Sequence, residues 1–352
     1  MLGVALFGLS LLLLTATLVA KLRLHHWWIR VWEFPRMQLA SLALASCLIS
    51  AFVEGPWQLP SLLVSLLVLG VQGWYILPWT PLYPVQVKAA KADSSDDRCI
   101  TLLIANVLTP NRNADGLISQ IKTLQPDVIL TLESDDWWQT QLDTALEADW
   151  PHSVKVPQDN LYGMHLYSRL QLQDAEVKRL IQDDIPSIHG WLLLDSRHRV
   201  RFHALHPRPP APQESDKSLW RDAELLLVGK EVHERDVPTL VFGDLNDVAW
   251  SRTTRLFCRV SGMLDPRRGR GLFSTFHADY RLLRWPLDHI FSSAHFTLGG
   301  MQRLERFGSD HFPILATLCY RPSRADEHDT PERDPGDRQE ARETINEAKT
   351  QA

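Results

Sequence analysis

Cysteine is scarce in this 352-residue chain, and there is no excess of positive charge. The four cysteines include no CxxC pair, which excludes a disulfide scaffold and argues against a cysteine-rich zinc site. The formal net charge of -5 gives no broad electrostatic reason for nucleic-acid binding. With 45% hydrophobic and 22% charged residues, the chain is neither disordered nor fibrous as a whole. Its length allows one domain of a couple of hundred residues together with appendages.

Charged side chains are missing from residues 1–20, which are rich in Leu, Val and Ala. At about 1.5 Å per residue, a helix of this length crosses a bilayer. A second uncharged run, 37–53, is short for a span, and a third, 57–79, carries Trp and Tyr near its ends, as segments at a membrane surface do. We predict a membrane anchor over residues 1–87 with about three transmembrane helices. Two spans, a cleaved signal peptide and buried core helices are the alternatives.

The charges of the loops predict the orientation of this anchor. Four Lys and Arg side chains lie between the first two runs, in residues 21–36, whereas the turn after the second run holds only Glu54. The positive-inside rule then places the first loop, and everything after residue 88, in the cytoplasm. Unpaired cysteines agree with such a reducing compartment. If the second run is not a span, the large domain faces the other side.

Beyond the anchor the chain divides into three parts. Residues 88–98 are polar and predict a linker, residues 99–320 are globular, and residues 321–352 carry six basic and nine acidic side chains. We expect that last part to be a disordered charged tail that could hold a weak helix near its end. In the globular part, short β-branched runs alternate with helical patterns such as 115–124 and 217–234. This alternation predicts an α/β domain with two packed sheets.

Polar side chains stand where the predicted strands end. Asn106 closes one apolar run, Glu133 follows another, and Asp244 and Asn246 lie in GDLN directly after a third. The other polar residues at such positions are His206, Asp288, His289, Ser309, Asp310 and His311. Each of them alone is typical of a turn or a helix cap. Because strand ends meet at one edge of a sheet, where ligands bind in layered α/β folds, we expect them to cluster.

The order of these motifs resembles the endonuclease/exonuclease/phosphatase superfamily, whose deoxyribonuclease I-like members also include abasic-site endonucleases, inositol polyphosphate 5-phosphatases and bacterial sphingomyelinases. The resemblance covers about residues 99–320. It rests on the first-strand Asn, the Glu after PDVILTL, YGMHLYSR, LHP, GDLN, PLDHI and GSDHFP, of which the last three together are highly specific. HPRPP, and the Trp-Ser pair after GDLN, are similar to membrane-anchored bacterial members. The resemblance implies a four-layer α/β sandwich with two mixed β-sheets, after N-terminal transmembrane helices in a bacterial inner membrane.

The resemblance also implies a metal site. Glu133 and Asn106 would hold a divalent cation, and Asp310 would lie near it. Only two histidines match the family pattern and no thiolate cluster is present, so Mg²⁺ or Mn²⁺ fits better than Zn²⁺.

The remaining matched residues would act on water and phosphate. Asp244 would orient or deprotonate the attacking water, and Asn246 would position the water and the phosphate. His311, paired with Asp288, and His206 would contact the phosphate and help to move protons.

Some positions depart from the pattern or match it loosely. Tyr162, beside Gly163, corresponds loosely to a phosphate-contacting position of several members. Leu108 stands where abasic-site endonucleases usually carry Asp, and Leu132 stands in place of their Gln. The basic loop of Arg267, Arg268 and Arg270 is either a phosphate-binding loop or a solvated surface loop.

The sequence therefore predicts a membrane-tethered, divalent-metal-dependent hydrolase of phosphoric esters. A lipid or small phosphoester is favoured over nucleic acid, which stays possible, because the chain is attached to a membrane and the domain is slightly acidic. The alternative is a non-catalytic membrane scaffold on the same fold, with the charged tail as its recruiting element. Nothing in the sequence indicates the oligomeric state.

Overall fold

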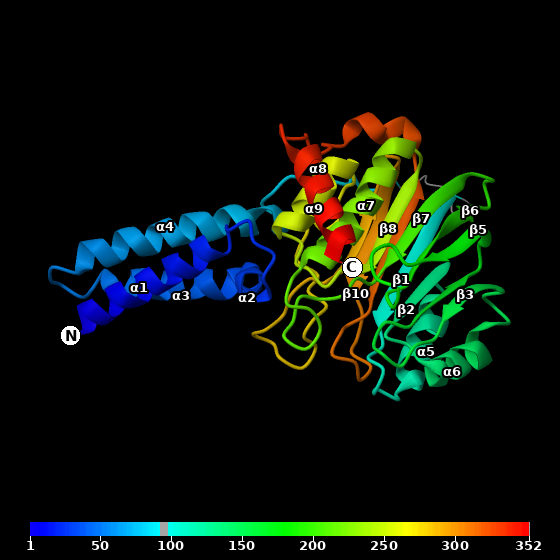
Figure 1. The fold of residues 1–352 in the computed structure, drawn as a ribbon, viewed down its shortest axis with the longest axis horizontal. Helices are drawn as coiled ribbons and strands as arrows, with labels where there is room; N and C mark the ends of the chain where they lie inside the picture. The colour runs from blue at the N-terminus through cyan, green and yellow to red at the C-terminus, as the bar shows by residue number, and fades with distance from the viewer. Residues whose placement is uncertain (92–97, 352) are drawn as a thin grey trace.

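Two β-sheets lie at the centre of the globular domain in this computed structural model, which describes residues 1–91 and 98–351 (Figure 1). The strands are β1 (Cys99–Asn106), β2 (Val128–Leu132), β3 (His152–Val156), β4 (Met164–Ser168), β5 (Gln171–Lys178), β6 (Ser187–Leu193), β7 (Arg199–Leu205), β8 (Thr239–Asp244), β9 (Asp288–Ser292), β10 (Phe296–Arg303) and β11 (Ile314–Tyr320). One sheet has the order β10-β11-β1-β2-β4-β3 and the other the order β5-β6-β7-β8-β9. Both sheets are mixed, because β1–β2 and β7–β8 are parallel pairs among antiparallel ones.

Side-chain alternation along the strands builds the core between the sheets. In β1, Ile104 belongs to the central core with Phe202 of β7 and Phe242 of β8. Its neighbour Leu103 points the other way and packs with Ile121 beneath the outer helices. Successive residues of a strand face opposite sides, so one strand serves two layers. β1 therefore joins the central core to an outer one.

Helices cover the outer face of each sheet. They are α5 (Ala114–Leu124) and α6 (Asp136–Leu146) on the six-stranded sheet, and α7 (Leu219–Arg235) and α8 (Arg252–Ser261) on the five-stranded sheet. Leu117 of α5 and Trp138 of α6 are completely buried. Leu225 of α7 and Phe257 of α8 are buried in the same way on the other side. The predicted four-layer α/β sandwich with two mixed sheets is confirmed.

The N-terminal helices form a bundle that extends from one side of the domain (Figure 1). They are α1 (Leu2–Val19), α3 (Arg36–Ser50) and α4 (Gln58–Ile76), the last continued by the 3-10 turn η2 (Leu77–Trp79). α1 and α4 are long and apolar enough to cross a membrane, whereas α3 is a shorter apolar helix. Apolar length alone is weak support for a span, so the membrane anchor remains a prediction.

Three serine hydroxyls meet inside this bundle. Ser10 of α1 lies 3.1 Å from Ser46 of α3 and 2.9 Å from Ser65 of α4, measured between Oγ atoms, and Ser65 donates to Ser46 at 3.2 Å. All three side chains are buried. Hydrogen bonds between small polar residues hold helices together where apolar packing alone has little specificity. The bundle is therefore a packed unit.

Residues 25–33, here called the anchor segment, connect α1 to α3 and lie on the domain. They include the short helices α2 (Trp27–Arg30) and η1 (Val31–Glu33). Trp250 Nε1 donates to the main-chain oxygen of Glu33 at 2.7 Å, and the Arg252 N–H donates to its Oε1 at 3.1 Å. The Ser218 N–H donates to the His25 carbonyl at 2.7 Å. The bundle and the domain are thus joined at a second place besides the chain that follows α4.

That following chain contains the predicted linker 88–98, of which residues 92–97 lie outside the described residues. Its start is ordered on the six-stranded sheet. The Ala90 N–H donates to the Leu298 carbonyl at 2.8 Å, and the Leu298 N–H donates to the Lys88 carbonyl at 2.9 Å. Residues 88–90 therefore extend the edge at β10.

The C-terminal segment is not the disordered tail that its composition suggests. It contains η4 (Pro322–Glu327) and α9 (Asp337–Gln351), and α9 packs on α7 and α8. Ala341, Ile345 and Ala348 are buried against Leu226 and Leu256. The physical reason is their spacing, which places these few apolar residues on one narrow stripe of the helix.

The expectation of four unpaired cysteines is also wrong. Cys99 of β1 and Cys319 of β11 face each other in the antiparallel register and form a disulfide. Cys47 and Cys258 are free. The two bonded residues are 220 positions apart, so no short cysteine motif marks the pair.

Candidate active site

Three strand ends bring the predicted metal-site and water-orienting residues together. Asn106 ends β1, Glu133 follows β2 directly, and Asp244 ends β8. Asn106 Nδ2 donates to Glu133 Oε1 at 2.7 Å and to Asp244 Oδ2 at 3.2 Å. Because β1 and β8 belong to different sheets, this amide joins the two sheets at one end of the sandwich.

His311 lies between two carboxylates at the same end. Its Nδ1 is 2.8 Å from Asp288 Oδ2, and its Nε2 is 3.5 Å from Asp244 Oδ2. Burial alone lowers the pKa of His311, but the charges of Asp288 and Asp244 outweigh it and raise this pKa to about 10. The imidazole is therefore a cation held by two acids, placed to stabilise negative charge that develops on a phosphate.

The turn after β8 fixes the orientation of Asp244. The Asn246 N–H donates to Asp244 Oδ1 at 2.8 Å, and the Asn246 side chain donates to the Pro207 carbonyl at 3.0 Å. Gly243 has a φ of +141°, and a Cβ there would lie 1.9 Å from the Leu205 carbonyl oxygen, so the position requires glycine. The GDLN motif is thus a turn that only glycine permits, with its carboxylate aimed at the site.

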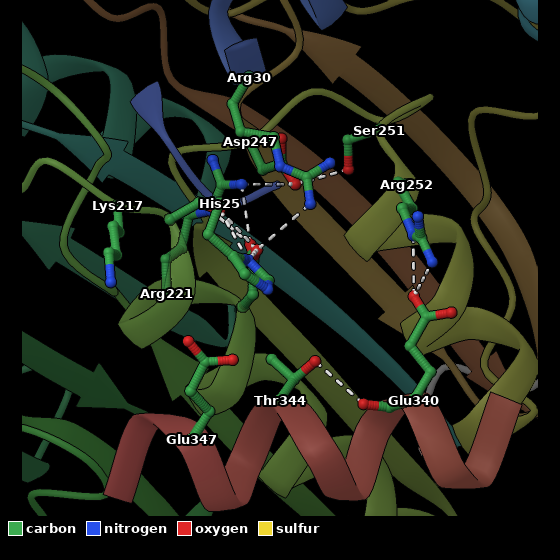
Figure 2. Close-up of polar contacts among 12 residues, drawn as sticks. His25, Arg30, Lys217, Arg221, Asp247, Ser251, Arg252, Glu340, Thr344 and Glu347 are labelled. Carbon is green, nitrogen blue, oxygen red and sulfur yellow. Dashed lines mark hydrogen bonds and ion pairs between the residues drawn. The ribbon is translucent and has the colours of Figure 1, made fainter. Parts of the chain in front are cut away.

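Charged groups behind this turn tie it to α7. Arg221 Nη1 donates to the Asn246 carbonyl at 2.7 Å, and its Nη2 lies 3.4 Å from Asp247 Oδ2. Ser251 donates to the same carboxylate of Asp247 at 2.5 Å (Figure 2). In the same view His25 and Arg30 of the anchor segment approach this network. The turn that carries Asp244 therefore rests on a buried network that reaches the anchor segment.

His206 and Tyr162 line the other side of the site. Their ring centroids are 5.4 Å apart, and both side chains are buried. His206 Nδ1 has no hydrogen-bond partner among the described residues, and burial lowers the pKa of His206. Tyr162 donates its hydroxyl to Glu214 Oε2 at 2.7 Å, and burial raises the pKa of this tyrosine. His206 Nδ1 is therefore free of protein partners among the described residues, whereas the Tyr162 hydroxyl is held by Glu214.

The donor set around Glu133 fits a hard divalent cation. Glu133 Oε2 is buried without a hydrogen-bond partner among the described residues, and burial raises the pKa of this carboxyl to about 7. A buried carboxylate oxygen that receives no hydrogen bond is costly unless a cation meets it. The side-chain oxygen of Asn106, whose amide nitrogen donates to Glu133, and the neighbouring carboxylate of Asp310 would complete an oxygen site of the kind that Mg²⁺ and Mn²⁺ prefer.

A second group could also be considered for a metal, namely Asp244, Asp288 and His311, whose ligand atoms lie within 4.8 Å of one another. Both nitrogens of His311 already face carboxylates. A protonated imidazole has no lone pair for a metal. The contacts of His311 therefore favour a proton-bonded chain over a metal site at these three residues.

Sequence reasoning missed the supporting residues Thr275 and Phe276, whereas Ser309 was expected among the polar residues at the strand ends. Ser309 donates to the Asn106 carbonyl at 2.8 Å, and Thr275 accepts the Asp288 N–H at 3.2 Å. The ring of Phe276 lies 5.0 Å from that of His311. Ser309 stands in GSDHFP, so the motif itself marked its place. Thr275 and Phe276 belong to no motif and could be found only from the fold.

Both expectations for the basic loop at 267–270 are wrong. Arg267 is completely buried, where its Nη2 binds Asp265 at 2.6 Å and its Nη1 donates to the Asp288 carbonyl at 3.1 Å. Arg270 donates to the Val87 carbonyl at 2.6 Å. These two guanidinium groups are bound by the protein itself, where Arg267 supports the start of β9 and Arg270 holds the chain at Val87.

Comparison with known proteins agrees with this geometry. Among solved structures, an endonuclease/exonuclease/phosphatase from Beutenbergia cavernae DSM 12333 is 15% identical, covering 64% of this chain and 72% of that one, with a TM-score of 0.52. The human Nocturnin catalytic domain with a bound sulfate is 14% identical, covering 64% and 96%, with a TM-score of 0.52. D. rerio TDP2 in complex with a single-strand DNA product is 16% identical, covering 62% and 98%, with a TM-score of 0.50.

At these identities the structural likeness establishes the fold alone. A search of curated proteins gave no match. The sequence of residues 103–311, more than half of the chain, matches the Endonuclease/Exonuclease/phosphatase family, whose members are usually hydrolases of phosphoester bonds and typically use divalent metals. The chain belongs to the Endonuclease/Exonuclease/phosphatase family.

Proposed function

We propose that this protein is a membrane-tethered, divalent-metal-dependent phosphoesterase that hydrolyses a phosphodiester or phosphomonoester. The observation that carries the proposal is the chain of contacts from Asp288 through His311 to Asp244, which lies beside Asn106 and Glu133. It combines a protonated imidazole, an oriented carboxylate and an oxygen donor set in one buried site. Phosphoester hydrolysis needs each of these three.

The residues can be given roles in the reaction. Asp244, held by the Asn246 N–H, would accept a proton from the attacking water, whose oxygen forms the new bond to phosphorus. The ester oxygen leaves as the old bond breaks and takes a proton. The cationic His311 would stabilise the phosphate oxygens, and His206 and Tyr162 would contact them from the opposite side.

Glu133, Asn106 and Asp310 would hold Mg²⁺ or Mn²⁺. When bound there, a divalent ion supplies positive charge to the nonbridging oxygens of the phosphate. Glu133 would bind it through the oxygen that receives no hydrogen bond within the described protein. Asn106 would keep the other oxygen of Glu133 in place.

The membrane part of the proposal rests on the bundle. α1 and α4 meet the length and hydropathy of spans, and α3 would be a third, shorter one. All three would be multi-pass helices of a bacterial inner membrane, with the domain in the cytoplasm as the loop charges predict. Fractionation of cells followed by extraction of the membranes at high pH tests this, because only an integral protein stays with the lipid.

The catalytic proposal is tested on the full chain in detergent or nanodiscs. The assay measures turnover of bis(p-nitrophenyl) phosphate and p-nitrophenyl phosphate with Mg²⁺, with Mn²⁺ and after EDTA. Asp244→Asn and His311→Ala should abolish turnover, whereas the matched controls Asp136→Asn, on the exposed start of α6, and His198→Ala, distant in the β6–β7 turn, should retain it. Absence of any metal-dependent turnover in the native chain would overturn the proposal in favour of a scaffold.

A further inference from the structure

Residues 275–285, here called the ribbon, fold back on themselves beside the active site. The N–H groups of Thr275 and Phe276 both donate to the Trp285 carbonyl, at 3.1 and 3.0 Å. The two arms of the ribbon are thereby held together at its base.

The base of the ribbon is part of the wall of the site. Thr275 accepts the Asp288 N–H at 3.2 Å, and the ring of Phe276 lies 5.0 Å from that of His311. The Ala278 N–H of the ribbon donates to the Asp310 carbonyl at 2.6 Å. A displacement of the ribbon would therefore move His311, Asp288 and Asp310, which line the site.

The tip of the ribbon, residues 280–283, is apolar and exposed. Tyr280 is 59% exposed, Leu282 is 83% exposed and Leu283 is 46% exposed. Among the large hydrophobic side chains described between residues 99 and 351, the only other one with such exposure is Val177, at 36%. Apolar exposure gathered in one place on an otherwise polar domain marks a contact surface.

The tip lies against the part of the molecule that would enter the membrane. Gln38, the third residue of α3, donates through Nε2 to the Leu282 carbonyl at 2.6 Å. An open hollow of about 960 Å³ separates α3 from the ribbon and β10, and Met37, Leu42 and Phe273 contribute to its lining. If α3 crosses a bilayer, Leu282 is at the depth of its first turn.

Basic side chains surround this apolar tip. Arg281, Arg284 and Arg303 line the same hollow. The guanidinium groups of Arg284 and Arg303 lie over the ring of Phe312, at 4.9 and 4.4 Å from its centroid. Arg281 makes no hydrogen bond or ion pair with the residues that the structure describes. Apolar side chains flanked by basic ones are the pattern of a segment that binds the surface of an anionic bilayer.

From these contacts we infer that the ribbon tip inserts into the same bilayer as the helix bundle, and that the substrate of the adjacent site is a phosphoester of a membrane phospholipid. The inference rests on the proposed function and deepens it. Water attacks phosphorus, one phosphorus–oxygen ester bond breaks, and the lipid alcohol or headgroup alcohol departs with a proton. The ribbon base keeps His311 and Asp288 close to the surface in which the tip is held.

The test uses the full chain in nanodiscs of phosphatidylcholine, with and without phosphatidylglycerol. Mass spectrometry measures phospholipid cleavage, while bis(p-nitrophenyl) phosphate and a single-stranded oligonucleotide are offered to the same preparation. We expect phospholipid cleavage, faster with phosphatidylglycerol because of Arg281. The double variant Leu282→Ser with Leu283→Ser should lower the ratio of phospholipid to soluble-ester turnover at least 10-fold, whereas Val177→Ser should keep the wild-type ratio.

Insertion itself is measured without catalysis. Leu282→Cys and Val177→Cys are made in a chain that also carries Cys47→Ser and Cys258→Ser, and each is labelled with a polarity-sensitive dye. In nanodiscs the emission of the dye at residue 282 should be shifted to the blue of that of the same dye free in water, and the emission of the dye at residue 177 should not. An unshifted dye at residue 282 overturns the insertion.

The other outcomes separate this inference from the function on which it depends. Turnover of the soluble ester or the oligonucleotide without phospholipid cleavage overturns the lipid substrate and leaves the phosphoesterase standing. An unchanged turnover ratio in the Leu282/Leu283 variant overturns the role of the tip. No metal-dependent turnover of any of the three substrates overturns the proposed function, and this inference with it.

Discussion

Arg221 of α7 donates a 2.7 Å hydrogen bond from Nη1 to the main-chain oxygen of Asn246, at the turn that carries Asp244. The same guanidinium lies 2.9 Å from Asp222 and 3.4 Å from Asp247, and all of these charges are buried. Asp222 in turn lies 3.1 Å from His25 of the anchor segment. The position of the turn therefore depends on an ionic network shared by the domain and the anchor.

Replacement of Arg221 should be strongly destabilising. Arg221→Met leaves Asp222 and Asp247 buried with less compensating charge, a change that typically costs about 3–5 kcal/mol in the free energy of unfolding. The control Arg199→Met removes an exposed pair with Asp174 and should cost no more than about 1 kcal/mol. Denaturant unfolding of the full chain measures both. A similar loss of unfolding free energy in the two variants would show that the buried network stabilises the fold no more than an exposed ion pair does.

Removal of the charge at Asp288 should slow catalysis without unfolding the site. Asp288→Asn takes away the nearer of the two carboxylates that keep His311 protonated, at 2.8 Å. Proton-transfer groups of this kind contribute about 10²–10⁴-fold to rate, so kcat should fall within that range. Steady-state kinetics with the soluble ester is the measurement, and Asp136→Asn is the control. A kcat equal to that of the wild type would contradict the role given to the pair.

Glu224 should make the protein less stable as pH rises. This side chain is buried in α7, and burial raises its pKa to about 8, above the usual value for Glu in an unfolded chain. Between about pH 5 and pH 8 the folded state keeps a proton that the unfolded state has lost, so its contribution falls by up to about 1.4 kcal/mol per pH unit. Glu224→Gln should flatten the profile in that window. Unfolding at a series of pH values measures the difference, and parallel curves for the two proteins would refute it.

The disulfide should be a large source of stability. Cys99 and Cys319 close a loop of 220 residues, and a bridge of this kind contributes about 2–5 kcal/mol. Reduction should therefore lower the melting temperature of the wild type but not that of Cys319→Ser. Thermal unfolding with and without reductant tests this, with Cys47→Ser as the control. If reductant still lowered the melting temperature of Cys319→Ser, the loss of stability could not be due to this disulfide.

The same bond reports which side of the membrane the domain faces. Disulfides persist in oxidising compartments and are rare in the cytoplasm. The loop charges predict a cytoplasmic domain, whose Cys99 and Cys319 would be isolated as thiols if alkylated before cell lysis. Recovery of the bonded form under these conditions would contradict that orientation and place the domain on the oxidising side.

The sequence was sufficient for the sheets and for the convergence of the site. Strand β2 is a short, fully buried run that Glu133 follows directly, and the fully buried strand β8 ends at Asp244. Glu133 and Asp244 could therefore be placed at one edge from local pattern alone. The family resemblance rests on the order of several motifs along the chain, and it suggested roles for these residues that no single strand end indicates.

What the sequence did not predict depends on partners far away in the chain. In the sequence Ile345 is one apolar residue among charged ones, and its burial depends on contact with Leu226 of α7 and Leu256 of α8. Arg267 reads as a surface residue because its burial depends on the packing of the Asp288 carbonyl and His289 around it. Such pairings have no local signature, since they arise only when the layers pack.

The pairing of β1 with β11 has a consequence for synthesis. The first strand of the domain lies between β2 and the last strand, so the six-stranded sheet stays open on that side until residue 320 has left the ribosome. By then the apolar helices at the N-terminus have long since emerged. The domain can therefore complete this sheet only after its last strand has been made, when the N-terminal helices have already been synthesised.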